Sequence, residues 1–224
     1  RRGYLIQLLP DDFASRAVAL DERPMVALGE EHAPFPRGYD IFEDESMIAV
    51  PLPGHADEQL GVLMRGADGR HIGIFLGDYF ARPSKQSGGW MGTLRDQEKL
   101  RGNVRPIILN VMNFNKGDPT LLSFEDARTL FHEMGHALHG LLSDVTFPSI
   151  SCTHVLTDWV ELPSQLYEHW FEQPEVLRKF ARHYRTGEPI PEDLVAKIHK
   201  AETFNQGFKT VEYLSSALID MKLH

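Results

Sequence analysis

The stretch TLFHEMGHALHG, residues 129–140, has two histidines four positions apart and a glutamate directly after the first of them. In an α-helix, positions i and i+4 lie on the same face, so His132 and His136 can bind one metal ion together. Glu133 then lies beside the ion rather than on it, where a carboxylate can take a proton from water. The alternative is a solvent-facing helix that carries these residues by chance, since short motifs have real false-positive rates.

The apolar residues of this helix fall on one face and its histidines on the other. At 100° per residue, the predicted core-facing stripe consists of Leu130, Met134, Leu138 and Leu141. A third histidine, His139, lies on the histidine side, but its axial distance from His132 is about 10.5 Å at 1.5 Å per residue. We therefore expect His139 to pack or to support the site rather than to bind the same ion.

A third ligand is sought in THVLTDWVELPSQLYEHW, residues 153–170. Glu161 follows His136 by 25 positions and lies near the start of a second predicted helix. Two histidines and a glutamate, with one position open for water, form a known type of catalytic zinc site. The alternative is a capping box in which Asp158 is the N-cap and Glu161 its partner three residues later. Spacing alone does not separate these two interpretations.

Composition limits the partners. The chain has 224 residues, of which 42% are hydrophobic and 25% charged, as is usual for a soluble globular protein. A formal net charge of −9 argues against a nucleic-acid partner, because phosphate binding needs a basic surface. No apolar run approaches the length of a membrane span, so no membrane partner is expected. The one cysteine, Cys152, excludes an intramolecular disulfide and indicates a reducing, cytoplasmic compartment. The oligomeric state is left open.

The fold class predicted is α+β and predominantly helical, with a small antiparallel or mixed sheet followed by helices. Residues 1–58 form an N-terminal segment with weak signals: helical turns at 11–20, a loop at 30–42 and a short strand at 45–54. Strands are expected over about 60–114. They include a hairpin that turns at Asp68-Gly69 and a buried strand at 105–114. The run GGWMG, residues 88–92, indicates irregular backbone or the close approach of another chain, and it either lines the substrate edge or is a plain loop.

Helices are predicted over about 123–224. A capping box of Ser123 and Asp126 begins the histidine helix, which runs to about residue 142. Further helices are expected at about 158–172, from Pro174, from Pro191 and over 207–224. On the helix expected at 158–172, Glu168 and Glu172 share a face with Glu161 and Gln165, so a solvated stripe is an alternative interpretation of this face. The last helix reaches the chain end without a cap, which suggests that the natural protein continues.

Taken together, TLFHEMGHALHG and TDWVELPSQLYEHW resemble the thimet oligopeptidase family of zinc metallopeptidases, which are gluzincins, and in particular its bacterial peptidyl-dipeptidase (Dcp) branch. That family has its zinc-binding helix as HEFGH and its third ligand in a V-E-x-P-S-Q segment. The likeness extends from residue 60 to the end. It implies that residues 59–224 are a zincin-like catalytic region, truncated relative to the family. By position, His132, His136 and Glu161 would bind one Zn²⁺, and Glu133 would be the general base and acid.

The resemblance implies zinc-dependent hydrolysis of peptide bonds in short oligopeptides, either internally or by release of C-terminal dipeptides. The family's downstream segment with histidine and tyrosine donors is absent, so the fragment is expected to bind zinc and to turn over slowly or not at all. The alternatives are a non-catalytic or weakly active zinc-binding fragment that binds peptides, and a metal-independent helical protein. Two positions depart from the family: Met134 replaces phenylalanine, and Cys152 replaces a loop glycine.

Overall fold

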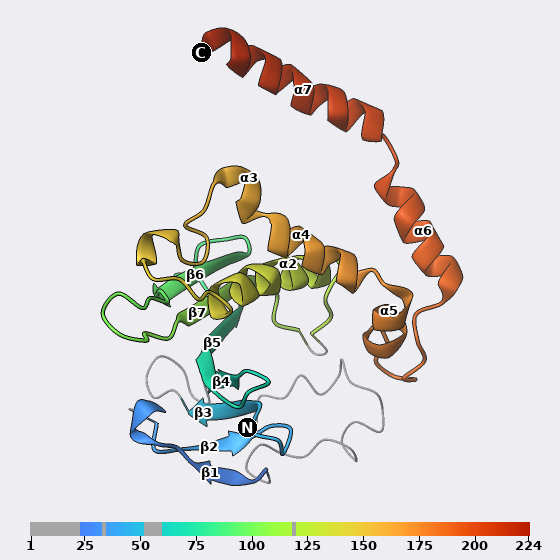
Figure 1. Ribbon diagram of the computed structural model, residues 1–224. Helices are drawn as coiled ribbons and strands as arrows, with labels where there is room; N and C mark the ends of the chain where they lie inside the picture. Colours follow the sequence, from blue (N-terminus) through green and yellow to red (C-terminus); the bar gives the residue numbers. More distant parts are fainter. Residues whose placement is uncertain (1–22, 33–34, 52–59, 118–119) are drawn as a thin grey trace.

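The computed structural model describes residues 23–32, 35–51, 60–117 and 120–224, and within them the chain is an α+β protein (Figure 1). One mixed sheet has the strand order β1-β2-β3-β4-β5-β7-β6. Its strands are β1 (Met25–Ala27), β2 (Arg37–Asp40), β3 (Met47–Pro51), β4 (Leu60–Arg65), β5 (His71–Phe80), β6 (Trp90–Arg95) and β7 (Ile107–Phe114). Neighbouring strands pair antiparallel except β5 and β7, which are parallel.

The N-terminal part of the sheet is larger than the sequence suggested. The strand expected at 45–54 is present as β3, which pairs with both β2 and β4. The loop interpretation of 30–42 was wrong in part, because this segment contains a 3-10 turn, η3 (Glu30–His32), and β2. Gly38 in β2 allows close approach to β3, since a Cβ there would lie 2.4 Å from Ile48 Cγ2. The turns expected at 11–20 lie outside the described residues.

The central strands follow the sequence more closely. The hairpin of β4 and β5 and the buried strand β7 are confirmed, and Gly69 has the positive φ of 75° that its turn requires. The prediction for GGWMG was wrong from Trp90 onward, because this residue begins the edge strand β6. Irregular backbone is confined to the residues before it, where Gly88 has a φ of 95°.

The histidine helix is α2 (Phe124–Leu141), and its predicted start is confirmed. The Ser123 hydroxyl accepts a hydrogen bond from the Asp126 N–H at 3.0 Å, and the Asp126 carboxylate accepts one from the Ser123 N–H at 3.0 Å. This capping box satisfies two polar groups that the helix end would otherwise leave unpaired. The first helical residue is thereby fixed, and with it the direction in which each later side chain points.

Helix α2 packs across β5, β7 and β6, but not with the whole stripe that periodicity predicted. The core between helix and sheet consists of Phe75, Ile108, Ala137 and Leu141, with Met134 packed against it. Leu138 instead lines a shallow groove beside α4. Gly140 allows the helix to approach the sheet closely, since a Cβ there would lie 2.6 Å from Ile108 Cδ1. A second core cluster is built on Ile48, Val50 and Leu63.

The single helix expected at 158–172 is divided. After η4 (Pro148–Ile150), a short helix α3 (Thr157–Val160) is followed by α4 (Leu162–Phe171), which packs on the outer side of α2. Pro163 lies in the first turn of α4 and has no N–H to continue the hydrogen-bond ladder of α3. Glu161 is therefore at the junction of two helices rather than inside one.

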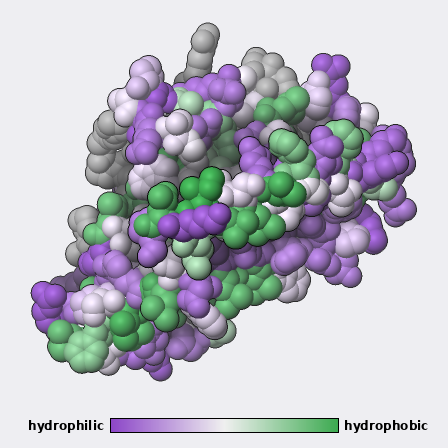
Figure 2. Space-filling view, turned by 90° about the horizontal axis from the view of Figure 1, so that it is seen from above, coloured by the Kyte–Doolittle hydropathy of each residue, from purple (hydrophilic) through white to green (hydrophobic). Residues whose placement is uncertain are grey.

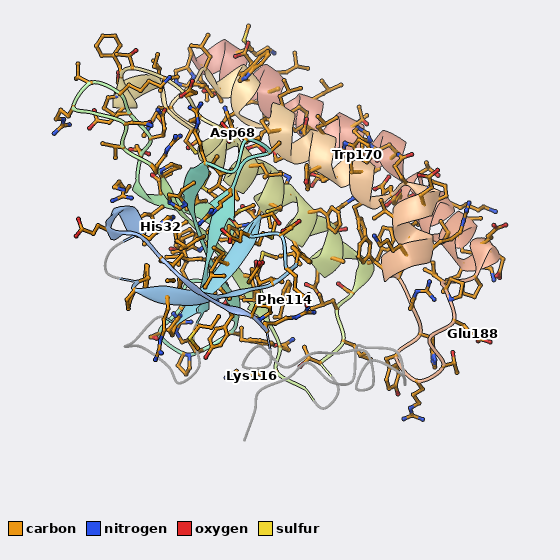
Figure 3. All side chains as sticks on the ribbon, turned by 60° about the horizontal axis from the view of Figure 1, so that its bottom comes forward. His32, Asp68, Phe114, Lys116, Trp170 and Glu188 are labelled. Carbon is orange, nitrogen blue, oxygen red and sulfur yellow. The ribbon has the colours of Figure 1, made fainter. Side chains whose placement is uncertain are left out.

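The remaining helices are α5 (Pro174–Phe180), α6 (Glu192–Glu202) and α7 (Gln206–Leu223). Figure 1 shows α6 and α7 leading away from the sheet. The face in Figure 2 has hydrophobic patches among polar ones, and exposed apolar side chains occur on both α4 and α7. In Figure 3, Trp170 marks the helical side and His32 the region beside the sheet. Among the described residues, no helix combines the length and apolar character needed to span a membrane.

Candidate metal centre

The structure brings the three predicted ligands together. One donor atom from each of His132, His136 and Glu161 lies within 4.8 Å of the other two. Glu161 Oε2 is 3.3 Å from His132 Nε2 and 3.1 Å from His136 Nε2. The two imidazoles meet edge to face, with ring centroids 4.9 Å apart, as neighbours one helical turn apart can.

Gly135 brings Glu161 to the histidines. A Cβ at Gly135 would lie 2.5 Å from the carbonyl oxygen of Pro163 and 2.6 Å from Ser164 Cα, so only glycine lets α4 approach this closely. The Ser164 hydroxyl lies 2.7 Å from Glu161 Oε2 and holds that carboxylate at the helix junction. The capping-box alternative is wrong, because the N-cap of α3 is Leu156, and Glu161 follows the last residue of this helix.

The surroundings of the site shift the pKa values of its side chains in different directions. Glu133 is only 5% exposed, and burial raises the pKa of its carboxyl group. Burial lowers the pKa of His136, which favours the neutral imidazole that can bind a metal. The hydrogen bond from Ser164 lowers the pKa of Glu161 and favours its anionic form. The cluster thus offers neutral and anionic donors, with a carboxyl group of raised proton affinity beside them.

The donor set fits a zinc ion. Two imidazole nitrogens and one carboxylate oxygen are the protein ligands of one class of catalytic zinc site. In a tetrahedral site with bonds of 2.0–2.1 Å, donor atoms are about 3.3 Å apart. Glu161 Oε2 is at this distance from both histidine Nε2 atoms. The Glu161 side chain is 47% exposed, so the cluster opens to solvent on one side.

Glu168 is a partner of His132 that the sequence analysis did not assign to the site. A solvated stripe was one interpretation of its face, but its Oε1 lies 2.6 Å from His132 Nδ1. A carboxylate acceptor at this position favours the His132 tautomer that has its proton on Nδ1, which leaves Nε2 available to bind a metal ion. The available signal was its position, two helical turns after Glu161 and on the same face.

His139 and Cys152 lie beside the centre and not in it. His139 is absent from the donor cluster, as its axial distance suggested, and it lines the groove of about 450 Å³ that also contains Leu138 and Cys152. Cys152 has a φ of 53°, in the left-handed region that favours glycine. This conformation explains why a glycine is usual at this position in the family that the sequence resembles.

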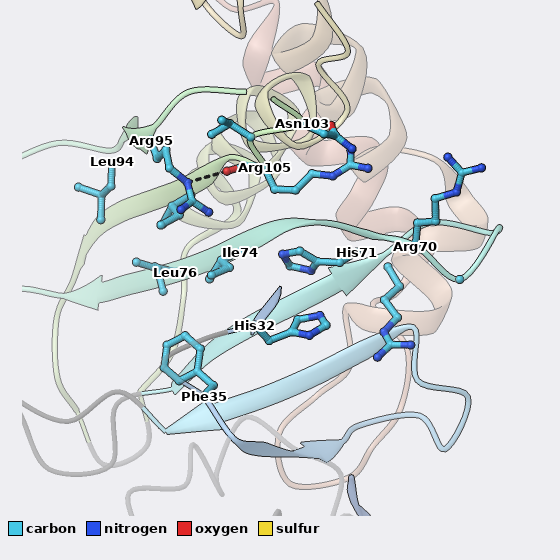
Figure 4. Close-up of a pocket in the computed structure, with 14 residues that line it drawn as sticks. His32, Phe35, Arg70, His71, Ile74, Leu76, Leu94, Arg95, Asn103 and Arg105 are labelled. Carbon is cyan, nitrogen blue, oxygen red and sulfur yellow. Dashed lines mark hydrogen bonds between the residues drawn. The ribbon is translucent and has the colours of Figure 1, made fainter. Parts of the chain in front are cut away.

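A second pocket is remote from this chemistry. It has a volume of about 860 Å³ and is lined by Ile74, Leu76 and Ile107 together with four arginines and His71 (Figure 4). Alternate residues of a strand face opposite sides of a sheet, and Phe75 and Ile108 face α2. This pocket is therefore on the side of the sheet away from the donor cluster, and we assign it no role in the chemistry of that cluster.

The chain belongs to peptidase family M3, whose model matches residues 57–224, the part of the chain that contains the two histidines and the convergent glutamate. It is 45% identical over 161 residues to a dipeptidyl carboxypeptidase of Salmonella typhimurium, covering 70% of this chain and 24% of that protein. It is 37% identical over 158 residues to oligopeptidase A of Escherichia coli, covering 68% and 23%. A mitochondrial intermediate peptidase of Lodderomyces elongisporus is 39% identical over 119 residues, covering 53% and 15%. The chain thus spans about a quarter, or less, of the length of these relatives.

Proposed function

We propose that this chain is the metal-binding part of a zinc peptidase that hydrolyses peptide bonds in short oligopeptides. The observation that carries the proposal is the convergence of His132, His136 and Glu161 beside the buried Glu133. The names of the relatives support both internal cleavage and the release of dipeptides, and the higher identity to the dipeptidyl carboxypeptidase favours the second mode. The single cysteine supports a cytoplasmic location for the protein.

The proposed chemistry divides between one ion and the protein. A zinc ion bound here supplies a Lewis acid that polarises the scissile carbonyl and lowers the pKa of water. Glu133 accepts the water proton on its carboxylate and donates it to the departing amine. The raised pKa of Glu133 suits this exchange, because a base with a higher proton affinity takes the proton more readily. Glu168 holds the His132 ring by its Nδ1–H.

For the chain alone, the proposal is zinc binding with slow turnover or none. The family that it resembles supplies further donors to the developing oxyanion from a segment downstream of the last helix. Loss of one such donor reduces the rate by about 10²–10³. The second candidate function is therefore that of a weakly active fragment that binds zinc. Under both candidates the chain binds zinc, and they differ only in whether this chain or the longer protein has the full peptidase activity.

The experiment combines elemental analysis with a fluorogenic short peptide. The purified chain is expected to bind one zinc ion, and Glu133→Gln to keep that zinc and lose any chelator-sensitive hydrolysis. Absence of stoichiometric zinc in the wild-type chain would identify a metal-independent protein and refute the proposal. If this chain hydrolyses the peptide as fast as an intact peptidase, the expectation of slow turnover is refuted, and the proposed peptidase function stands.

A further inference from the structure

Arg128 lies one turn before His132 on α2 and faces carboxylates from three helices. Its Nη2 binds Glu172 of α4 and lies 3.1 Å from Glu202 Oε1 of α6. Its Nε is 3.7 Å from Glu168 Oε2. The Arg128 side chain is 24% exposed, so these charges are partly shielded from water and their interactions are only partly screened.

Glu168 lies between this guanidinium and the candidate metal centre. Its Oε1 accepts the hydrogen bond from His132 Nδ1 at 2.6 Å, while Oε2 faces Arg128. The two oxygens thus have different neighbours: Oε1 has the hydrogen-bonded imidazole, and Oε2 has the guanidinium at 3.7 Å, whose charge attracts it and favours this rotation of the carboxylate. Arg128 thus contacts Glu168, and Glu168 contacts His132. The other ring nitrogen of His132, Nε2, lies beside Glu161 in the candidate metal centre.

Removal of the positive charge would leave four carboxylates, those of Glu125, Glu168, Glu172 and Glu202, without the guanidinium between them. Like charges at short range repel, and α4 side chains on a partly exposed face can turn toward water to separate. Glu168 would then leave His132 or hold it less firmly. Among the described residues, the Arg128 guanidinium is the group that links all of these carboxylates, whereas His132 contacts only Glu168 among them and His199 contacts only Glu202.

We propose that Arg128 is a positioning residue for the metal centre: through Glu168 it holds the His132 ring in the orientation that binds the ion. This inference rests on the proposed function, since it assumes that His132 is a metal ligand. Loss of an outer partner of a ligating histidine typically reduces metal affinity by about 10–100-fold. Arg128 acts one contact further out, so a smaller reduction of about 3–10-fold is expected for its removal.

The test is a double-mutant cycle on zinc affinity, measured by competition with a chromophoric chelator and not by hydrolysis. The variants are R128M, E168Q and the double variant, each compared with the wild-type chain. R128K is the conservative variant, which keeps the charge. K197M is the matched control, because Lys197 forms an exposed ion pair with Asp193 on α6, remote from Glu168.

The expected result is that R128M weakens zinc binding by about 3–10-fold, that R128K largely restores it, and that K197M has no effect. In the E168Q background, R128M should change the affinity by less than about twofold, because the contact through which it acts is already lost. Equal affinity in R128M and wild type would refute the inference, and so would an equal loss in both backgrounds.

A purely structural role for Arg128 gives a different result. It would lower the melting temperature of R128M in both backgrounds and leave the zinc affinity of the folded chain unchanged, which also refutes the inference. If R128M does not fold by circular dichroism, R128Q replaces it in the same cycle, since its amide can still bind Glu172. Failure of the wild-type chain to bind zinc would instead refute the proposed function, so the two failures are distinguishable.

Discussion

Substitution of Gly135 by alanine tests how the centre is assembled. The added Cβ would lie 2.5 Å from the Pro163 carbonyl oxygen and 2.6 Å from Ser164 Cα, which are backbone atoms that cannot rotate away. Ordinary contact requires about 3.5 Å, so α4 must move outward by roughly 1 Å. Glu161 would move with it, although its Oε2 now lies 3.1 Å from His136 Nε2.

The expected magnitudes follow from this displacement. Alanine improves helix propensity by about 1 kcal/mol, while overpacking costs about 1–3 kcal/mol, so the unfolding free energy should fall by roughly 0–2 kcal/mol. Ligand positions tolerate errors of about 0.2 Å, so we expect zinc affinity to fall by about 10–100-fold. The assays are chelator competition and urea denaturation.

Gly207 on α7 provides the matched control, because nothing lies within 4 Å of a Cβ added there. G207A should leave zinc affinity unchanged and should not lower stability. If G135A binds zinc as tightly as the wild-type chain, the close approach of α2 and α4 does not determine the site, and the reasoning is refuted.

Three further predictions concern the frame around the centre. Burial and the nearby positive charges lower the pKa of His71 to about 4, so its unfolded form binds a proton between about pH 6.5 and pH 4 that the folded form does not. The contribution of His71 to the unfolding free energy should therefore be constant above about pH 6.5 and be lost as the pH decreases toward 4. Over this range, the unfolding free energy should fall by about 1–3 kcal/mol more in the wild-type chain than in H71Q. Urea titrations at several pH values check this, and parallel curves would contradict it. Gln97 is buried, and its amide donates to the Val145 carbonyl at 3.1 Å and accepts from the Val145 N–H at 2.8 Å. Q97A should lower the unfolding free energy by about 2–4 kcal/mol in urea, while Q173A at an exposed position should change it by less than about 0.5 kcal/mol; equal effects would show that burial of this bridge is unimportant. Cys152 is buried and its pKa is raised by burial, so a thiol reagent should modify it only as fast as the chain opens, and rapid reaction without denaturant would be the contrary result.

The elements fixed by local chemistry were predictable from the sequence. The capping box set the start of α2, Asp68-Gly69 set the hairpin, and the spacing of His132 and His136 set two donors on one helical face. Each of these depends on residues within one or two turns of each other, so the sequence alone contains the information.

The errors arose where distant parts of the chain meet. The break at Glu161 and the contact at Gly135 depend on how closely α4 approaches α2, which periodicity does not report. Leu138 was assigned to the core because a helical wheel gives a face but not the neighbour that covers it. The contact of Glu168 was not predicted for the same reason, since a glutamate on a polar face becomes a partner of His132 only when the other helix is in place.

The short sequence span of the centre also affects how it can form. Residues 132–161 contain all three donors and Glu133, so they come together by the docking of two neighbouring helical segments. Short loops cost little entropy to close, and contacts between near neighbours form quickly. The parallel pairing of β5 with β7, as of Ile74 with Ile107, spans a similar length of chain, because a parallel pair needs a crossover connection. The donors therefore belong to one continuous segment whose two helices dock on each other, while the sheet supplies the frame on which α2 packs.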